Sequence, residues 1–226
     1  PVRGRVLRWV TVLAAVVLVA AGVWVVRFSP LLVVRAVAIH RLPSSGGVLS
    51  EAQIRDAAQV RMSVPMVTES LEGVANRVRS LKPVATVQVH RSWPHTLTIE
   101  VTERTAAYAW KSGSGYQLVD PTGFAFLQVG SVPKGLVPVT AAGASPTLLT
   151  GLAVVVDTLP RDLVKKVDRV EAPSPDQVTV YLDSGVRVIW GNSADSGLKV
   201  QITQALLKVK KVKVIDVSAP GQPTTR

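Results

Sequence analysis

The strongest pattern of hydrophobic and polar positions lies near the start of the chain, where 18 consecutive residues from Trp9 carry no ionisable side chain. A helix that crosses a bilayer core needs about 20 apolar residues, within a range of roughly 17–25. Arg8 and Arg27 flank the run, and Trp9 and Trp24 lie near its ends, where indole rings favour the membrane interface. The pattern predicts one transmembrane helix over residues 9–27.

Two other interpretations of this run exist. A cleaved signal peptide would place its cleavage site near Gly22, but signal-peptide apolar regions span only about 7–15 residues and this run continues through Val26. A buried core helix would normally show a polar stripe, which is missing here. Three arginines precede the run, so we expect residues 1–8 to form a short cytoplasmic segment and the rest of the chain to lie outside the membrane.

The next 70 residues alternate between strand and helix patterns. Period-two alternation predicts a first strand at residues 32–40, and a serine N-cap opens an amphipathic helix at 50–60. A second helix is expected over 68–81, ended by Lys-Pro. Two further alternating segments, 85–90 and 96–102, are separated by a short turn and predict a hairpin. The expected order is β-α-α-β-β.

The rest of the chain reads as mostly antiparallel β structure with a few helices. Asp120-Pro-Thr-Gly123 has proline and glycine where a type I turn favours them, so a hairpin is expected there. Residues 146–157 are apolar throughout, and their period fits a helix or a strand. Further segments are expected in this order: a short helix at 159–166, a hairpin at 178–191, a helix at 199–208 and a strand at 211–218. The Pro/Gly-rich residues 219–226 are expected to form a flexible tail.

Residues in the first hairpin and just beyond it carry a family resemblance. The run Val87–Trp110 is similar to the signature of the FtsQ/DivIB family of bacterial cell-division proteins. The signature positions include Arg91, Trp93, Pro94, Glu103 and Arg104. The resemblance implies an α+β protein: a transmembrane helix, a POTRA (polypeptide-transport-associated) domain over residues 32–104, and a β domain over 105–218.

Composition narrows the chemistry. The chain has no cysteine, which excludes disulfides, thiolate catalysis and cysteine-bound metal. Its formal net charge is +11, which outside a membrane favours anionic lipid, acidic wall polymers or an acidic protein partner over nucleic acid. The simpler interpretation, which we favour, is that the charge provides solubility and protects edge strands. The sequence gives no reason to expect a cofactor or a small-molecule substrate.

No catalytic or metal site is expected. The only histidines, His40, His90 and His95, have no pattern of converging ligands, and no pair of carboxylates is singled out. Two matches to the S-x-x-K motif of penicillin-binding enzymes begin at Ser131 and Ser196, but the chain lacks the S-x-N element that this chemistry needs. We therefore interpret both matches as chance.

The end of the β domain is the main candidate for partner binding. Lysines alternate with valines there, a pattern that either protects an edge strand or lets it accept a strand from a partner. The family resemblance implies that such partners are the coiled-coil membrane proteins FtsB and FtsL. The candidate residues are Lys211, Val212, Lys213, Val214, Ile215, Asp216, Val217 and Ser218. In the POTRA domain, either Val33–Ile39 or the hairpin Ala85–Thr102 is a second candidate edge. There Trp93 either anchors an interface or packs on the neighbouring domain.

These observations favour a non-enzymatic divisome scaffold, held in the cell membrane at the division septum by a single helix with its N-terminus in the cytoplasm. Two alternatives remain. One is a POTRA-containing component of protein export or envelope assembly, although the sequence lacks the repeated strands of a barrel. The other is a cell-wall hydrolase.

Overall fold

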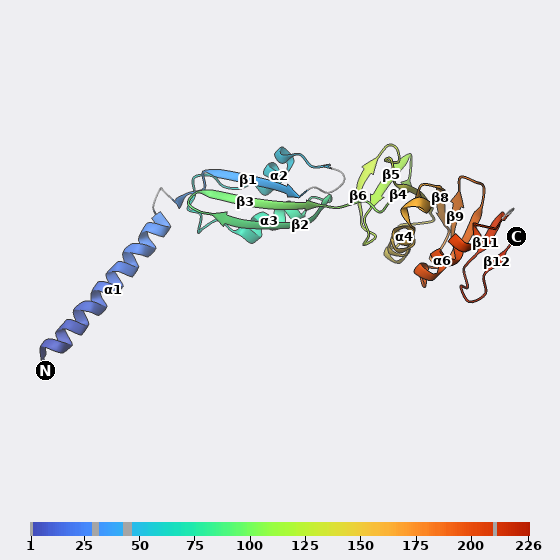
Figure 1. Ribbon diagram of the computed structural model, residues 1–226. Coiled ribbons are helices and arrows are strands. Elements are labelled where there is room, and N and C mark those ends of the chain that lie inside the picture. The colour runs from blue at the N-terminus through green and yellow to red at the C-terminus, as the bar shows by residue number, and fades with distance from the viewer. Residues whose placement is uncertain (1, 29–31, 43–46, 210–211) are drawn as a thin grey trace. The chain divides into compact units, whose positions relative to one another are not determined.

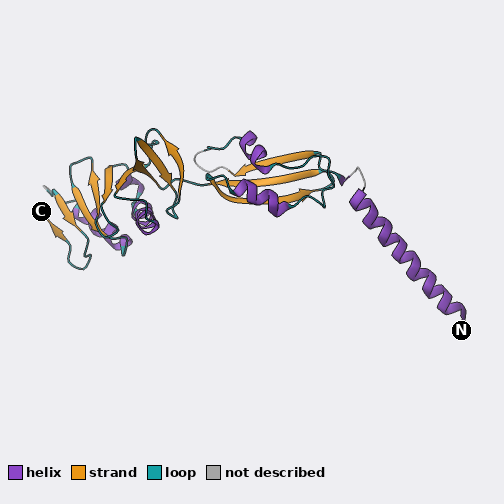
Figure 2. Cartoon of the chain, turned by 180° about the vertical axis from the view of Figure 1, so that it is seen from behind, coloured by secondary structure: helices purple, strands orange, loops and turns teal. Residues whose placement is uncertain are grey.

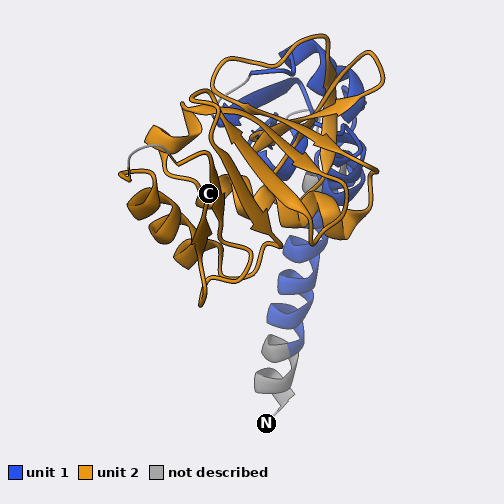
Figure 3. Ribbon diagram, turned by 90° about the vertical axis from the view of Figure 1, so that its right-hand side faces the viewer, with its two compact units in different colours: residues 1–103 blue, residues 104–226 orange. Residues whose placement is uncertain are grey.

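The computed structural model describes residues 2–28, 32–42, 47–209 and 212–226 and divides the chain into two compact units, residues 1–103 and 104–226 (Figure 3). The first element is helix α1, Val2–Phe28, whose described side chains, Trp9 to Trp24, are all exposed. Over the described residues, no helix combines the length and apolar composition that a bilayer crossing requires.

After α1, the first unit forms a three-stranded sheet with two helices (Figure 1). The elements are β1 Ala36–Leu42, α2 Glu51–Ala58, α3 Leu71–Arg79, β2 Val84–Ser92 and β3 Thr96–Glu103. The sheet order is β1-β3-β2, with β1 parallel and β2 antiparallel to the central β3. This is the β-α-α-β-β order that the sequence predicts.

Local sequence explains where the two helices begin. Ser50 accepts a hydrogen bond from the Gln53 amide, and the Gln53 side chain accepts one from the Ser50 amide in return, which forms a capping box. Ser70 caps α3 with a single hydrogen bond, which its side chain accepts from the Gly73 amide. The apolar faces of the helices pack on the sheet around a core that includes Val34, Ile54, Met66, Val74, Val78, Leu97, Ile99 and Val101.

The second unit is a nine-stranded sheet with helices (Figure 2). Its order is β12-β11-β10-β9-β8-β7-β4-β5-β6. The strands are β4 Tyr108–Ser112, β5 Gly115–Val119, β6 Ala125–Val129, β7 Val137–Ala141, β8 Val167–Ala172, β9 Val178–Leu182, β10 Arg187–Gly191, β11 Val214–Asp216 and β12 Thr224–Thr225. The helices are α4 Pro146–Thr158, α5 Arg161–Val164 and α6 Ser196–Leu206.

The segment with the ambiguous period is helix α4. Ser145 caps it through the Leu148 amide, and Pro146 stands at its first turn, where a missing N–H costs nothing. Its buried residues pack against α6 and against one face of the sheet. That core also holds Tyr108, whose hydroxyl donates to the Leu149 carbonyl at 2.9 Å, and whose pKa is raised by burial and by the nearby Asp120 charge.

Two tight turns show why glycine is required where it stands. Gly123 closes the β5–β6 turn at φ +83°, and a Cβ there would lie 2.5 Å from Thr150 Oγ1. Gly191 ends β10 at φ +76°, and a Cβ there would lie 2.9 Å from the Cβ of Ser218. Gly191, at the end of β10, therefore lies directly against Ser218, where the chain turns away after β11.

The end of the chain differs from the sequence expectation of a flexible tail over residues 219–226. Within it, Thr224–Thr225 forms strand β12, antiparallel to β11. The Gln222 amide donates to the Ala219 carbonyl at 2.9 Å, which closes the turn that brings the chain back. Proline and glycine in this segment make a turn between strands, and the β-branched threonines after it extend the sheet.

Candidate partner-binding surface

The structure places the sequence-predicted strand 211–218 inside the sheet and not at its edge. β11 pairs with β10 on one side and with β12 on the other, so its backbone groups are used on both sides. Lys211 lies outside the described residues. Val212 and Lys213 lead into β11, and the buried Val217 and exposed Ser218 follow it. The expectation that this strand offers unpaired backbone is therefore wrong.

Among the described residues, the outermost strand at this end of the sheet is β12. Val214 and Arg226 donate to each other's carbonyls at 2.9 Å in both directions, which makes them a hydrogen-bonded pair of the antiparallel ladder. The adjacent pair is Ile215 with Thr225. Because hydrogen-bonding direction alternates along an antiparallel strand, the N–H and C=O of Thr225 point away from β11. Thr225 thus presents a donor and an acceptor to any strand that arrives at this edge.

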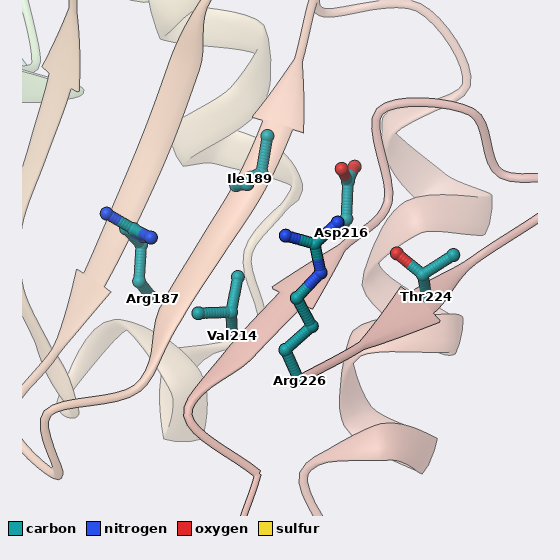
Figure 4. A pocket seen from close by; sticks show the side chains of 6 residues that line it. All are labelled: Arg187, Ile189, Val214, Asp216, Thr224 and Arg226. Atoms are coloured by element: carbon teal, nitrogen blue, oxygen red, sulfur yellow. The ribbon is translucent and has the colours of Figure 1, made fainter.

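Alternate residues of β8, β9, β10 and β11, together with Thr224 and Arg226 at the edge, form an open face. Strand register sets them in two rows across the sheet. The first row is Arg169, Tyr181, Arg187, Val214 and Arg226, and the second is Glu171, Thr179, Ile189, Asp216 and Thr224. The residues nearest the edge line a shallow pocket, with Val214 and Ile189 between polar groups (Figure 4).

Some arginines on this face have acidic partners within the described residues and others do not. The Arg169 guanidinium lies 4.1 Å from the Tyr181 ring centroid and pairs with Asp168 and Glu171, and the hydrogen bond from Arg169 to Glu171 lowers the pKa of Glu171. Among the described residues, no ion pair engages the side chains of Arg187 or Arg226. The pocket therefore carries two cations and one carboxylate, Asp216, which accepts hydrogen bonds from the amide and the hydroxyl of Ser218.

The second S-x-x-K match lies behind the sheet and serves its packing. Ser196 Oγ accepts from the Trp190 indole N–H at 3.1 Å and donates to the Ser193 carbonyl at 2.8 Å. Lys199 is 1% exposed, and its Nζ donates to the Asn192 carbonyl at 2.9 Å. Burial lowers the Lys199 pKa, against the opposing charge of Asp195. Both side chains hold the β10–α6 turn in place.

The signature residues of the first unit have structural contacts. Arg91 donates from Nε to the Met66 carbonyl at 2.7 Å and from Nη2 to the Glu69 carbonyl at 2.9 Å, which ties the loop before α3 to β2. The buried Glu103 accepts from the Val48 amide at 2.7 Å. Trp93 precedes Pro94 through a cis peptide bond in the β2–β3 turn and is exposed.

Arg104, the last signature residue, is the first residue of the second unit and contacts the β5–β6 turn of that unit. Its guanidinium pairs with Asp120 and lies 4.4 Å from the Phe124 ring centroid. Burial tends to raise the Asp120 pKa, but hydrogen bonds from Thr122, Phe124 and Arg104 outweigh it and hold that pKa below its ordinary value. Adjacent residues Glu103 and Arg104 are thus each fixed within their own unit, Glu103 by the first and Arg104 by the second.

The remaining candidates from the sequence are placed as follows. Both candidate POTRA edges exist, because β1 and β2 are the outer strands of the three-stranded sheet. Beside β1, a groove against α2 is lined by Val37, Val60 and Met62 together with polar side chains. Trp9 and Trp24 are exposed on α1. Within the described part of the chain, no three histidine or acidic side chains gather as a metal site would require.

Sequence reasoning missed Arg187, Tyr181, Thr224 and Arg226. A signal was present for Thr224 and its neighbour, since two β-branched residues follow a Pro/Gly turn. For Arg187 and Tyr181 the alternation of the 178–191 hairpin fixed which side chains share a face, but it did not indicate which face the helices leave open.

Fold and surface together define a two-module protein: a small POTRA-type module followed by a β domain with an open edge. Family models agree, since the "POTRA domain, FtsQ-type" matches residues 47–104 and the "Cell division protein FtsQ/DivIB, C-terminal" matches residues 108–218. The chain belongs to the FtsQ/DivIB family of cell-division proteins, which confirms the resemblance seen in the sequence.

Curated relatives cover nearly all of the chain. A cell division protein FtsQ of Streptomyces venezuelae is 32% identical over 94% of this chain and 81% of its own length. One from Streptomyces coelicolor is 33% identical over 97% of this chain and 88% of its own length. One from Mycobacteroides abscessus is 29% identical over 99% of this chain and 72% of its own length.

Proposed function

We propose that the protein is a non-enzymatic scaffold of the division machinery whose β domain captures an extended segment of a partner along β12. The observation that supports this most directly is the outward-facing backbone of Thr225 at the end of a nine-stranded sheet. A strand that pairs there gains affinity from backbone hydrogen bonds, while alternate side chains supply specificity.

The neighbouring pocket indicates the chemistry of that segment. Val214 and Ile189 give it an apolar floor, and Arg187 and Arg226 provide cations at its rim. An acidic residue next to an apolar one in the partner would match this arrangement. We take the partners to be the coiled-coil membrane proteins of the FtsB and FtsL type, in keeping with the family, and the captured assembly to link early and late division proteins.

We further propose that α1 holds the protein in the cell membrane at the septum as a single-pass anchor. Support comes from the uncharged run that begins at Trp9, and from the exposure of every described α1 side chain from Trp9 to Trp24. The three arginines before the run favour a cytoplasmic N-terminus, with both folded units on the outer side.

The edge-capture proposal is tested by Thr225→Pro, with Thr225→Val as the matched control. Proline removes the outward N–H of Thr225 but leaves the Val214–Arg226 pair available, so the β11–β12 ladder persists. Valine keeps the N–H and the branched shape. In pull-downs of FtsB/FtsL-type partners from membranes, we expect proline to reduce capture at least about tenfold, equal to about 1.4 kcal/mol, and valine to change it little.

If the proline and valine variants capture the partners equally, and both keep the native melting temperature, the proposal that partners pair along β12 is refuted. A second variant, Val214→Pro, distinguishes loss of the outward N–H of Thr225 from loss of the whole strand β12. It removes the bond from the Val214 amide to the Arg226 carbonyl and so releases β12 itself. Capture should then be lost together with some stability, whereas Thr225→Pro should lose capture alone.

A further inference from the structure

Three exposed apolar side chains lie on two loops of the first unit. Trp93 is 53% exposed in the β2–β3 turn, while Met62 and Val67, at 50% and 37%, lie in the loop between α2 and α3. Exposure of half of a large indole to water is unfavourable, and burying that apolar surface against another apolar surface would lower the free energy. We call these three residues the apolar tip.

Backbone hydrogen bonds hold both loops at the end of the unit where the chain arrives from α1. The Met66 amide donates to the Leu32 carbonyl at 2.9 Å, which fixes the α2–α3 loop beside the arriving chain. The Arg35 amide donates to the His95 carbonyl at 2.9 Å, which fixes the β2–β3 turn beside it as well. The apolar tip therefore lies around the start of β1.

The chain length between α1 and this end sets an upper limit on their separation. α1 ends at Phe28, and Leu32 is already hydrogen-bonded to the folded unit. Four residue steps of at most 3.3–3.6 Å span about 14 Å, whatever the direction of α1. The end of the unit that carries the apolar tip therefore starts within about 14 Å of the last turn of α1.

We propose that the apolar tip rests in the headgroup layer of the bilayer that holds α1, so that its partner is a phospholipid surface. This rests on the membrane anchoring proposed above. Tryptophan is the side chain that most favours the membrane interface, and Met62 and Val67 add apolar area on either side of the arriving chain.

The opposite end of the same sheet gives an internal comparison. Leu42 ends β1, six residues from Ala36 and therefore roughly 20 Å away along the strand, and is 56% exposed. β3 ends at that same end, where the chain leaves for the second unit. With the apolar tip in the headgroups, the sheet becomes a spacer that directs its Leu42 end away from the membrane.

The chain contains no cysteine, so single cysteines can be introduced as reporters. We would place the full chain, carrying Met62→Cys or Leu42→Cys with a fluorescent label, in liposomes with anionic lipid and headgroup-attached nitroxide lipid. Nitroxide quenching should be at least about threefold stronger at residue 62 than at residue 42. In the Met62→Cys protein, Trp93→Asp should reduce this quenching and Trp93→Tyr should preserve it.

Flotation of the same liposomes separates this proposal from the anchoring on which it rests. Protein that floats but is quenched equally weakly at both positions keeps the anchor and overturns the apolar tip. Protein that fails to float overturns the anchoring, and the apolar tip with it. If Trp93→Asp leaves quenching unchanged in floated protein but removes the protein from the septum, the tip binds a protein and not lipid, which also overturns the proposal.

Discussion

The two faces of the C-terminal sheet come from alternate residues of the same strands, yet they differ in what they do. On β10, Trp190 is 1% exposed and packs beneath the helices, while the adjacent Ile189 lines the open pocket. Tryptophan and isoleucine both favour β-strands, so strand propensity does not distinguish Trp190 from Ile189. The difference is made by what covers each face, so one face supports the fold and the other is available for recognition.

Topology explains why the helices cover one face only. β7 and β8 are parallel and joined through α4 and α5, and β10 and β11 are parallel and joined through α6. Both connections move in the same direction along the sheet, between strands that all run the same way. Because such crossovers are right-handed almost without exception, both sets of helices must lie on the same face. Near β12 the helices leave the opposite face uncovered.

The largest expected difference between the two faces is in stability. Trp190→Ala should lower the free energy of unfolding by about 3–5 kcal/mol, because it leaves a cavity and removes the indole donor to Ser196. The matched change on the open face, Ile189→Ala, should lower it by less than about 1.5 kcal/mol. Urea denaturation of the two variants measures both values. Equal losses would mean that the open face is packed in solution.

A smaller effect is expected at Lys199, a cation on the covered side. Lys199→Met should lower stability by about 1–2 kcal/mol near neutral pH, because it removes the hydrogen bond to the Asn192 carbonyl while it relieves the buried charge.

Lys199 also predicts a pH dependence. Burial lowers its pKa in the folded state, so as pH rises the folded protein releases this proton before the unfolded chain does. The unfolded state then binds more protons, and stability rises with pH between the lowered folded pKa and the ordinary pKa of lysine. Denaturation midpoints at alkaline pH should show this rise in the native protein. If the rise persists in Lys199→Met, another group causes it.

Most of the fold could be predicted from the sequence because its signals are local. Serine caps, alternation and turn residues fix where α2, α3 and the β2–β3 hairpin begin and end. Segment 146–157 was ambiguous because its apolar residues show no face by themselves. Its identity as a helix follows from the Ser145 cap and from burial between sheet and α6, and only the first of these is visible in sequence.

The candidate surface was harder to predict because an edge is a property of strand order. The alternation in residues 211–218 correctly indicates a strand, but whether β11 is an edge depends on whether a later segment pairs with it. The segment that pairs with β11 is Thr224–Thr225, and two residues are too few to show a periodic pattern in the sequence. Likewise, the pattern around Arg187 shows that it shares a face with Tyr181, but not that helices cover the other face.

The smallest expected effect on stability belongs to the open face and should accompany a large effect on binding. Arg187→Glu should change the free energy of unfolding by less than about 0.5 kcal/mol, since its side chain is exposed and has no ion pair within the described residues. It should weaken capture of an acidic partner at least about tenfold, more at low salt than at high salt. Lys165→Glu, an exposed reversal of the same charge at the end of α5, is the control and should leave capture unchanged. If both reversals weaken capture equally, the protein attracts its partner by net charge, and the pocket beside β12 does not select it.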